Sequence, residues 1–297
     1  MNKIKLFHSV WSKPQEEASR WNYSKECREY VELLVTATSV SFAKKSGCAI
    51  SLQTDNIGKK KYDWLPYDDV QTSLEGHDYS PHFWASGKVM AQQYEPLGSI
   101  QIDTDVFIKN QGTVGMLQHF NNYDLITQNI ETNYECGDRA AYSSFIEMLE
   151  GTTLPDLPEA DFSPGHCNAY CCGTVGFNSQ ELKDLYIDGY KKIYQKLITN
   201  PGLDAVAKQN CMDLFCEQSW LYQAVKAKNA KVFCLLETLA ASQSAVNIGY
   251  THLAFISKYK LEVIERVEQM LLGIAPGIYR KVIEIKPDNL KVTNTNH

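Results

Sequence analysis

Residues 100–108 read IQIDTDVFI, an apolar stretch typical of a buried strand that two aspartates interrupt. A buried carboxylate without a partner is costly, so Asp103 and Asp105 need something to pair with. Carboxylates held one residue apart at the end of a strand can bind Mg²⁺ or Mn²⁺ and present the ion to the phosphates of a ligand. The pattern also arises by chance in a chain of 297 residues, so two solvated aspartates in a turn are the alternative.

The segments before this stretch alternate between strand and helix patterns. We expect, in order, a strand at 4–11, a helix at 24–47, a strand at 48–55, a short strand within 64–74 and a helix at 83–98. This order predicts β-α-β units and a parallel sheet with right-handed crossovers. In such sheets ligands bind beyond the carboxyl ends of the strands, where Asp55 and the aspartate pair lie.

The second half also alternates. We expect a strand and loop at 123–131, a helix at 139–151, a linker or mobile loop at 152–165, one strand at 166–178, helices at 179–197, 212–229 and 260–273, and a disordered tail at 293–297. Asn178, three residues before Glu181, is the expected N-cap of the first of these helices.

Composition and sequence patterns argue against several classes of protein. A net charge of −6 and a pI near 5.7 give no general attraction to nucleic acid or to anionic membranes. No stretch approaches the roughly 20 apolar residues of a membrane span, and the N-terminus lacks the apolar core of a signal peptide. We therefore expect a cytoplasmic protein with reduced cysteines. The sequence also lacks a Walker phosphate loop and a Gly-x-Gly-x-x-Gly dinucleotide fingerprint.

Four further segments surround the aspartates in a recognisable order: WASGK (84–88), NAYCCGTVGFN (168–178), CEQSWL (216–221) and THLAFISK (251–258). Together with IQIDTDVFI they resemble the metal-dependent GT-A glycosyltransferases of the glycogenin and bacterial galactosyltransferase type. They resemble more closely a family of bacterial and phage GT-A-like proteins. The resemblance covers residues 4–260. It implies an α/β, Rossmann-like GT-A fold with a mixed, mostly parallel sheet flanked by helices, in one domain (1–260) followed by a C-terminal helix and tail (261–297).

The resemblance also implies a metal site. Asp103 and Asp105 match the pair that binds Mn²⁺ or Mg²⁺ and the diphosphate of a nucleoside diphosphate sugar, and His252 matches the late histidine that completes the metal site. Lys258 matches the lysine that holds the phosphates, although the glycine and the Pro-Trp that usually follow it are missing. A histidine bonded within a loop is the alternative for His252.

Further residues are expected to contact the donor sugar or nucleotide. Lys88 matches a basic residue that reaches the phosphate or the sugar, and a solvated helix lysine is its alternative. Asn168 and Ala169 match a segment that bonds the sugar hydroxyls, and Thr104 lies between the two aspartates. Two more donor-binding candidates follow strands: Trp11, which could stack on the base or simply pack in the core, and Asp55, which could bond the nucleoside or cap the next turn.

Glu217 and Gln218 match an Asp-Gln pair that faces the anomeric carbon, and are the catalytic candidates. A carboxylate or amide there can stabilise an oxocarbenium-like state or bond the acceptor. The alternative is an exposed Glu-Gln pair in an ordinary helix. Two rival sites use cysteine: a zinc site from Cys167 and Cys171 with Cys211 and Cys216, and a thiol nucleophile assisted by His166 or His252.

The sequence thus favours a glycosyltransferase that moves a sugar from a nucleoside diphosphate sugar to an unknown acceptor, which could be a glycan, a protein or a modified base of phage DNA. The order of motifs leans toward retention of anomeric configuration. The alternative from another class is a non-catalytic GT-A-like module that binds a nucleotide sugar or a glycan.

Overall fold

The computed structural model describes residues 3–14, 23–131, 168–199, 215–237, 242–253, 255–288 and 290. Within these residues the central sheet has seven strands in the order β10-β6-β9-β4-β1-β2-β3. Their bounds are β1 Lys5–Val10, β2 Ala49–Thr54, β3 Asp69–Gln71, β4 Ile100–Ile102, β6 Leu125–Thr127, β9 Thr174–Phe177 and β10 Val232–Cys234. β9 runs antiparallel to both of its neighbours, whereas the other pairs are parallel. The predicted α/β fold with a mixed, mostly parallel sheet is confirmed.

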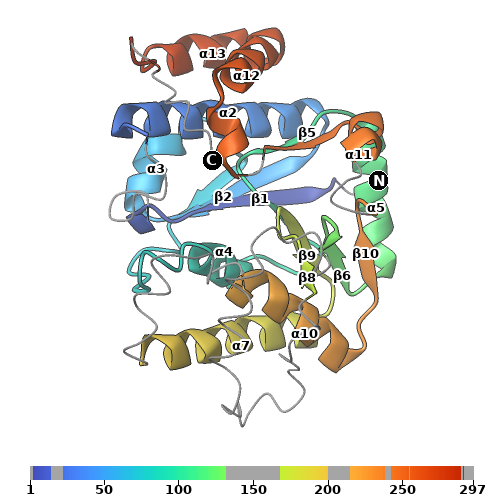
Figure 1. Cartoon of the computed structure of the whole chain (residues 1–297). Coiled ribbons are helices and arrows are strands. Elements are labelled where there is room, and N and C mark those ends of the chain that lie inside the picture. The colour runs from blue at the N-terminus through green and yellow to red at the C-terminus, as the bar shows by residue number, and fades with distance from the viewer. Residues whose placement is uncertain are drawn as a thin grey trace.

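Helices cover both faces of this sheet (Figure 1). On one side lie α2 (Lys25–Lys45), α12 (Leu261–Ile274) and α13 (Pro276–Ile283). On the other side lie α4 (Ser86–Ala91), α7 (Gln180–Ile198) and α10 (Trp220–Lys228). The remaining described helices are α3 (Asn56–Tyr62), α5 (Gln111–Gln118) and α11 (Ser242–Ile248). In the described part of the chain, no helix combines the length and the apolar character needed to cross a bilayer.

The α2 helix is defined by local capping signals and by packing on two sides. The Ser24 side chain accepts a hydrogen bond from the Cys27 N–H at its start, and Gly47 adopts a φ of 80° just beyond its end. Its middle is buried on all sides, because the sheet covers one face and the C-terminal helices cover another. Val31 and Leu34 share a core cluster with Ile264 and Leu271 of α12. The C-terminal helices therefore continue the core of the sheet domain.

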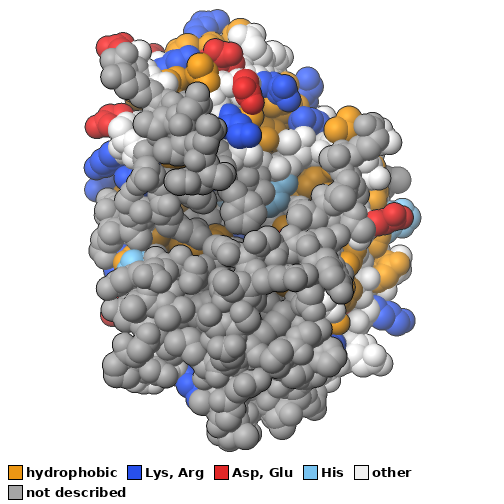
Figure 2. All heavy atoms as spheres, in the orientation of Figure 1, with side chains coloured by type: hydrophobic (Ala, Val, Ile, Leu, Met, Phe, Trp, Pro, Cys, Tyr) orange, Lys and Arg blue, Asp and Glu red, His pale blue; other side chains and the backbone are white. Residues whose placement is uncertain are grey.

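The surface of the C-terminal helices is mixed in charge. Figure 2 shows acidic and basic side chains close together over this end of the molecule, with hydrophobic side chains between them. The mixture differs from the single-sign basic stripe that a DNA-binding face presents.

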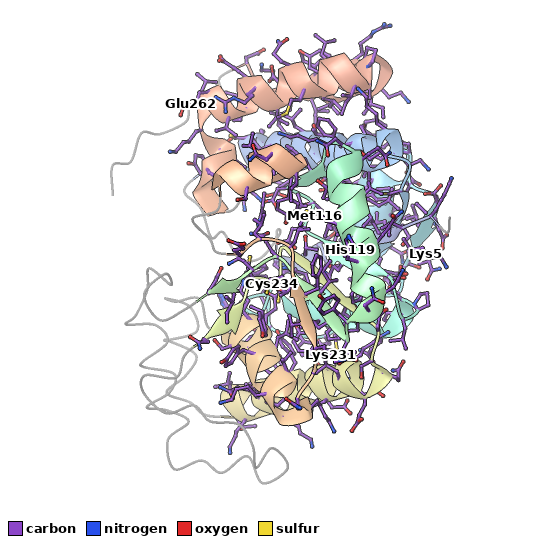
Figure 3. All side chains as sticks on the ribbon, turned by 90° about the vertical axis from the view of Figure 1, so that its right-hand side faces the viewer. Lys5, Met116, His119, Lys231, Cys234 and Glu262 are labelled. Carbon is purple, nitrogen blue, oxygen red and sulfur yellow. The ribbon has the colours of Figure 1, made fainter. Side chains whose placement is uncertain are left out.

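The α5 helix lies at the edge of the sheet formed by β10 (Figure 3). Figure 3 looks at this edge, where α5, which contains the labelled Met116, lies beside the outermost strand β10, which ends at the labelled Cys234. Met116 and Phe233 pack against the same buried cluster.

Three sequence predictions about local structure are wrong. Residues 100–108 are not one strand, because β4 ends at Ile102 and a separate strand, β5 (Val106–Ile108), begins after a turn. The stretch 166–178 is also divided, into β8 (Ala169–Tyr170) and β9. The N-cap of α7 is Ser179, whose hydroxyl accepts from the Leu182 N–H, while Asn178 instead donates to two backbone carbonyls.

Two smaller antiparallel sheets complete the described strands. β5 pairs with β11 (Tyr250–His252), and β7 (Ile130–Glu131) pairs with β8. The predicted helix at 139–151, the linker at 152–165 and the tail at 293–297 lie outside the described residues.

Candidate metal and donor site

The turn between β4 and β5 places the two aspartates. The Asp103 N–H donates to the carbonyl of Gly173 at 2.9 Å, and the Val106 N–H donates to the carbonyl of Asp103 at 2.9 Å. The chain thus leaves the central sheet at the carboxyl end of β4 and enters the small β5–β11 sheet. Both carboxylates lie at the junction of the two sheets.

The β5–β11 pairing brings His252 to this junction. His252 lies opposite Val106 in the register, and the Leu253 N–H donates to the carbonyl of Asp105 at 3.0 Å. His252 Nε2 lies 3.5 Å from Oδ1 of Asp105 and 3.8 Å from Oδ2 of Asp103. His252 is therefore a strand residue fixed by backbone pairing, not a loop histidine.

These three side chains have the donor set of a divalent metal site. Their ligand atoms all lie within 4.8 Å of one another. Two neighbouring ligands at about 2.1 Å from an octahedral ion lie about 3 Å apart. Small rotations of the three side chains would bring their ligand atoms to this spacing. Two hard carboxylates and one imidazole suit Mn²⁺ or Mg²⁺ better than a soft thiophilic ion. The residues fit the group that the sequence predicts.

Two buried lysines supply positive charge to the same cluster. Nζ of Lys88, from α4, lies 2.8 Å from Asp103 Oδ1 and 2.8 Å from Glu217 Oε1. Nζ of Lys258 lies 3.2 Å from Asp105 Oδ2 and 3.2 Å from Glu32 Oε1. Neither lysine is a solvated surface residue, since their side chains are 11% and 14% exposed.

The carboxylates and the cationic side chains of the site each shift the pKa values of the other toward the charged form. Burial alone would raise the pKa of Asp105, but the Lys258 ammonium and the His252 ring outweigh it and hold that pKa well below its ordinary value. Burial would lower the pKa of Lys88, but Asp103 and Glu217 hold it well above its ordinary value. Burial also opposes the charged form of His252, yet its interactions with Asp105 and Cys171 raise its pKa to about 10. The side chains of the site thus form a compact network of oppositely charged groups.

The catalytic candidates lie next to this cluster. Phe215–Ser219 forms one π-helical turn that leads into α10, and it contains Glu217 and Gln218. Glu217 is 1% exposed and Gln218 is 8% exposed, so the exposed-helix alternative is wrong. The turn is anchored by Trp220, whose indole Nε1 donates to the Tyr186 carbonyl of α7 at 2.8 Å. Lys88 forms ion pairs with both Glu217 and Asp103, and so connects the catalytic candidate to the metal cluster.

Other predicted residues have different surroundings. Trp11 is 7% exposed and packs edge-to-face on His77, with ring centroids 4.6 Å apart. Asp55 is the N-cap of α3, and its oxygens accept from the Gly58 N–H, the Ser12 N–H and the Ser12 hydroxyl. The structure thus gives Asp55 the capping role that the sequence left open.

The segment expected to hold the sugar lies along β8. Asn168 donates to the Tyr222 hydroxyl at 3.2 Å, and Ala169 pairs with Glu131 in the β7–β8 ladder. Thr104 lies in the turn between the aspartates and is partly exposed. Neither Asn168 nor Ala169 belongs to the charged cluster itself.

Of the rival cysteine sites, the described residues bring together Cys171 and His252, whose side chains interact. His166, Cys167 and Cys211 lie outside the described residues. Cys171 and Cys216 are buried free thiols, and burial raises the pKa of Cys171. A raised pKa disfavours the thiolate that a nucleophile or a zinc ligand requires.

Three residues of the site were missed from the sequence. Gln128 accepts at the second nitrogen of His252, Gly173 lies against the His252 ring, and Glu32 of α2 holds Lys258. Glu32 lies in the helix predicted at 24–47, Gln128 in the strand and loop predicted at 123–131, and Gly173 in the segment expected to contact the sugar, but no site role was assigned to them.

Comparisons with known proteins identify a family and a similar solved structure. A family model described as "Family of unknown function (DUF6734)" matches residues 4–285. No curated protein matches the chain. Among solved structures, the chain is similar to the crystal structure of mouse xyloside xylosyltransferase 1 in its apo form. That similarity has 12% sequence identity, covers 78% of each chain and has a TM-score of 0.31, which is too low to bear on function.

Proposed function

The chain belongs to the DUF6734 family, and from its site we propose that it is a metal-dependent glycosyltransferase that uses a nucleoside diphosphate sugar. One observation carries this proposal: Asp103, Asp105 and His252 converge at the carboxyl end of β4 with two buried lysines beside them. A dication flanked by ammonium groups is suited to a diphosphate, because the ligand's several negative charges need several positive partners.

The chain's own residues have separable roles in this proposal. Lys258 and Lys88 would turn from their carboxylate partners toward the phosphates, and both are already charged and desolvated. Asp103, Asp105 and His252 would hold Mn²⁺ or Mg²⁺, which when bound neutralises the charge that builds on the departing diphosphate. Desolvation strengthens each of these contacts relative to water.

Glu217 is the residue proposed to face the sugar. It is buried and lies 2.8 Å from the lysine that also contacts Asp103, so a donor whose phosphates engage that lysine would place its sugar near this carboxylate. A carboxylate there can stabilise positive charge at the anomeric carbon. We propose Gln218, Asn168 and Ala169 as further sugar contacts, and Thr104 and Trp11 as contacts to the rest of the donor. The oxygens of Asp55 are already used in capping α3.

The reaction product distinguishes the stereochemical courses. On the motif order we propose retention, so the anomeric configuration of the product should equal that of the donor. Proton NMR of the first product formed reads this configuration directly. The acceptor is a glycan, a protein or a modified base, and an acceptor panel with these three classes identifies it.

The test of the proposal combines binding with turnover. Calorimetry should show that a nucleoside diphosphate binds only when Mn²⁺ or Mg²⁺ is present, and donor hydrolysis or transfer should stop in EDTA. The double variant Asp103→Asn with Asp105→Asn should lose both the metal-dependent binding and the EDTA-sensitive turnover. Asp188→Asn, at an exposed aspartate of α7 that also pairs with a lysine, should lose neither.

The outcomes separate the alternatives. Turnover that EDTA and the double variant leave unchanged would overturn the metal mechanism. Metal-dependent donor binding without turnover on any acceptor would identify a nucleotide-sugar-binding module instead of an enzyme.

A further inference from the structure

The side of the His252 ring that faces away from the aspartates is closed by Gln128. Nδ1 of His252 lies 2.8 Å from Oε1 of Gln128. Gln128 follows β6 directly and is 4% exposed. The two nitrogens of His252 therefore have different partners: carboxylates at Nε2 and an amide oxygen at Nδ1.

The surroundings of Gln128 fix which end of its amide faces the ring. Its Nε2 donates to Oδ1 of Asn129 at 3.1 Å, and the Tyr250 hydroxyl donates to its Oε1 at 2.7 Å. The contact with Asn129 fixes this orientation, because Nδ2 of Asn129 donates to the Ile130 carbonyl at 3.1 Å and its Oδ1 is therefore the acceptor. The Tyr250 hydroxyl only adds a second donor to the same Gln128 oxygen. The backbone of Gln128 is also fixed, because its N–H donates to the Cys171 carbonyl and its carbonyl accepts from the Leu236 N–H.

On its Nδ1 side the ring lies close against the backbone of Gly173. Gly173 lies so close that a Cβ added there would be 2.5 Å from Cε1 of His252 and 2.6 Å from Nδ1. The same added atom would be 2.6 Å from Oε1 of Gln128. Gly173 therefore confines the ring and the amide as a packed pair.

We propose that Gln128 is a positioning residue that keeps a proton on Nδ1 of His252 and thereby reserves Nε2 as the ligand atom for the divalent cation. The inference rests on the proposed function for the presence of that cation. A neutral imidazole has one N–H and one lone pair, so an acceptor fixed at Nδ1 directs the lone pair to Nε2. With the cation bound, Nδ1 would keep its proton in the bond to Gln128, and Nε2 would face the ion.

The experiment measures Mn²⁺ affinity in the full chain without donor, from the EPR signal of free Mn²⁺. Gln128→Met keeps the volume but removes the acceptor, and should weaken Mn²⁺ binding about 10- to 100-fold. Gln128→Glu restores an acceptor and should hold the affinity near that of the wild type. Tyr250→Phe is the matched control, since it removes the other hydrogen bond to the same oxygen and should also bind Mn²⁺ as the wild type does.

A second measurement needs no variant. In the Cd²⁺-loaded wild type, ¹⁵N NMR of the histidine side chains should show His252 protonated at Nδ1 with the metal at Nε2. The opposite arrangement would overturn the inference, as would Gln128→Met binding Mn²⁺ like the wild type, or all three variants losing affinity equally. In those cases Mn²⁺ still binds the wild type and the proposed function stands. A wild type that binds no Mn²⁺ would overturn the proposed function and this inference together.

Discussion

Nζ of Lys88 lies 2.8 Å from Oδ1 of Asp103 and 2.8 Å from a carboxylate oxygen of Glu217. On the other side of the site, Lys258 lies 3.2 Å from Asp105. Each aspartate of the Asp-x-Asp pair therefore has a lysine partner in the structure. The lysines balance the buried carboxylates until a dication replaces them, and the same ammonium groups are then available for phosphates.

The first prediction is that Lys88→Met strengthens the binding of Mn²⁺ alone but weakens the binding of a nucleoside diphosphate. A unit charge about 5 Å from a dication opposes it by about 1.7 kcal/mol even at the dielectric of water, so Mn²⁺ affinity should rise on the order of tenfold. The ligand meanwhile loses a phosphate partner. Mn²⁺ titration and calorimetry with the diphosphate read the two effects separately.

The control for Lys88 is a lysine with a similar partner away from the site. Lys286 lies 2.7 Å from the buried Glu268, so Lys286→Met should cost stability and leave Mn²⁺ affinity unchanged. A fall in the Mn²⁺ affinity of Lys88→Met would contradict the idea that lysine and metal compete for Asp103.

The second prediction concerns Gly173. In Gly173→Ala the new methyl group would displace the His252 ring and the Gln128 amide, which lie 2.5 and 2.6 Å from its position. Neither neighbour can retreat easily, because one is fixed by strand pairing and the other by its own hydrogen bonds. We expect a loss of Mn²⁺ affinity with a modest loss of stability, measured by Mn²⁺ titration and thermal unfolding. Unchanged Mn²⁺ affinity would show that the ring is free to adjust.

Sequence patterns predicted much of this site. The residues that converge in the structure, Asp103, Asp105, His252, Lys88 and Glu217, were all selected from short motifs. Apart from the two aspartates, which were placed at the carboxyl end of a predicted strand, they were selected because the order of the motifs resembles that of GT-A glycosyltransferases. The early strand and helix pattern up to Gly47 was also predicted, since its caps and apolar spacing are local signals.

The division of residues 100–108 could not be predicted in this way. Val106–Ile108 has the same apolar character as Ile100–Ile102, and only pairing with Tyr250–His252, far along the chain, places it in another sheet. Gln128 was missed for a related reason. A glutamine after a strand has many roles, and its contact with His252 is a product of tertiary structure.

The third prediction is that Gly189→Ala destabilises the protein although alanine is the better helix former. A Cβ at Gly189 in α7 would lie 2.0 Å from Cζ2 of Trp220, which is 2% exposed. Overpacking of this kind costs about 1–3 kcal/mol, more than the gain in helix propensity, which is at most about 1 kcal/mol. Urea unfolding measures the difference.

At a second helical glycine, the same substitution should increase the unfolding free energy. Gly115 in α5 has no atom within 4 Å of an added Cβ, so Gly115→Ala should stabilise the protein by up to about 1 kcal/mol. Because Trp220 anchors the turn that holds Glu217, Gly189→Ala should also lower turnover, whereas Gly115→Ala should not. If Gly189→Ala were as stable as the wild type, the packing of α7 on α10 would have to be looser than observed.

The last prediction is an acid sensitivity that originates at His8 in β1. The ring is fully buried, with Nδ1 2.7 Å from the Tyr67 hydroxyl and Nε2 3.0 Å from Oγ of Ser39. Ser39 donates its own proton to the Val106 carbonyl, so it accepts from Nε2–H, and Nδ1 accepts from Tyr67. The neutral ring therefore satisfies both of its nitrogens, and a second ring proton would conflict with the Tyr67 donor. Burial accordingly lowers the pKa of His8 to about 3, although the charge of Asp105 opposes this shift.

The folded-state pKa of His8 lies below its unfolded value of about 6.5, so the unfolded chain takes up the proton first as the pH falls. The stability that His8 contributes is complete above about pH 6.5 and decreases by about 1.4 kcal/mol per pH unit down to pH 3. Between pH 7 and pH 5 the wild type should lose about 2 kcal/mol more unfolding free energy than His8→Asn, as measured in urea. The slope contributed by His77, whose pKa burial lowers to about 4, remains in both proteins and cancels. His119→Gln, at an exposed histidine, should follow the wild type, and parallel curves for the wild type and His8→Asn would exclude His8 as the source.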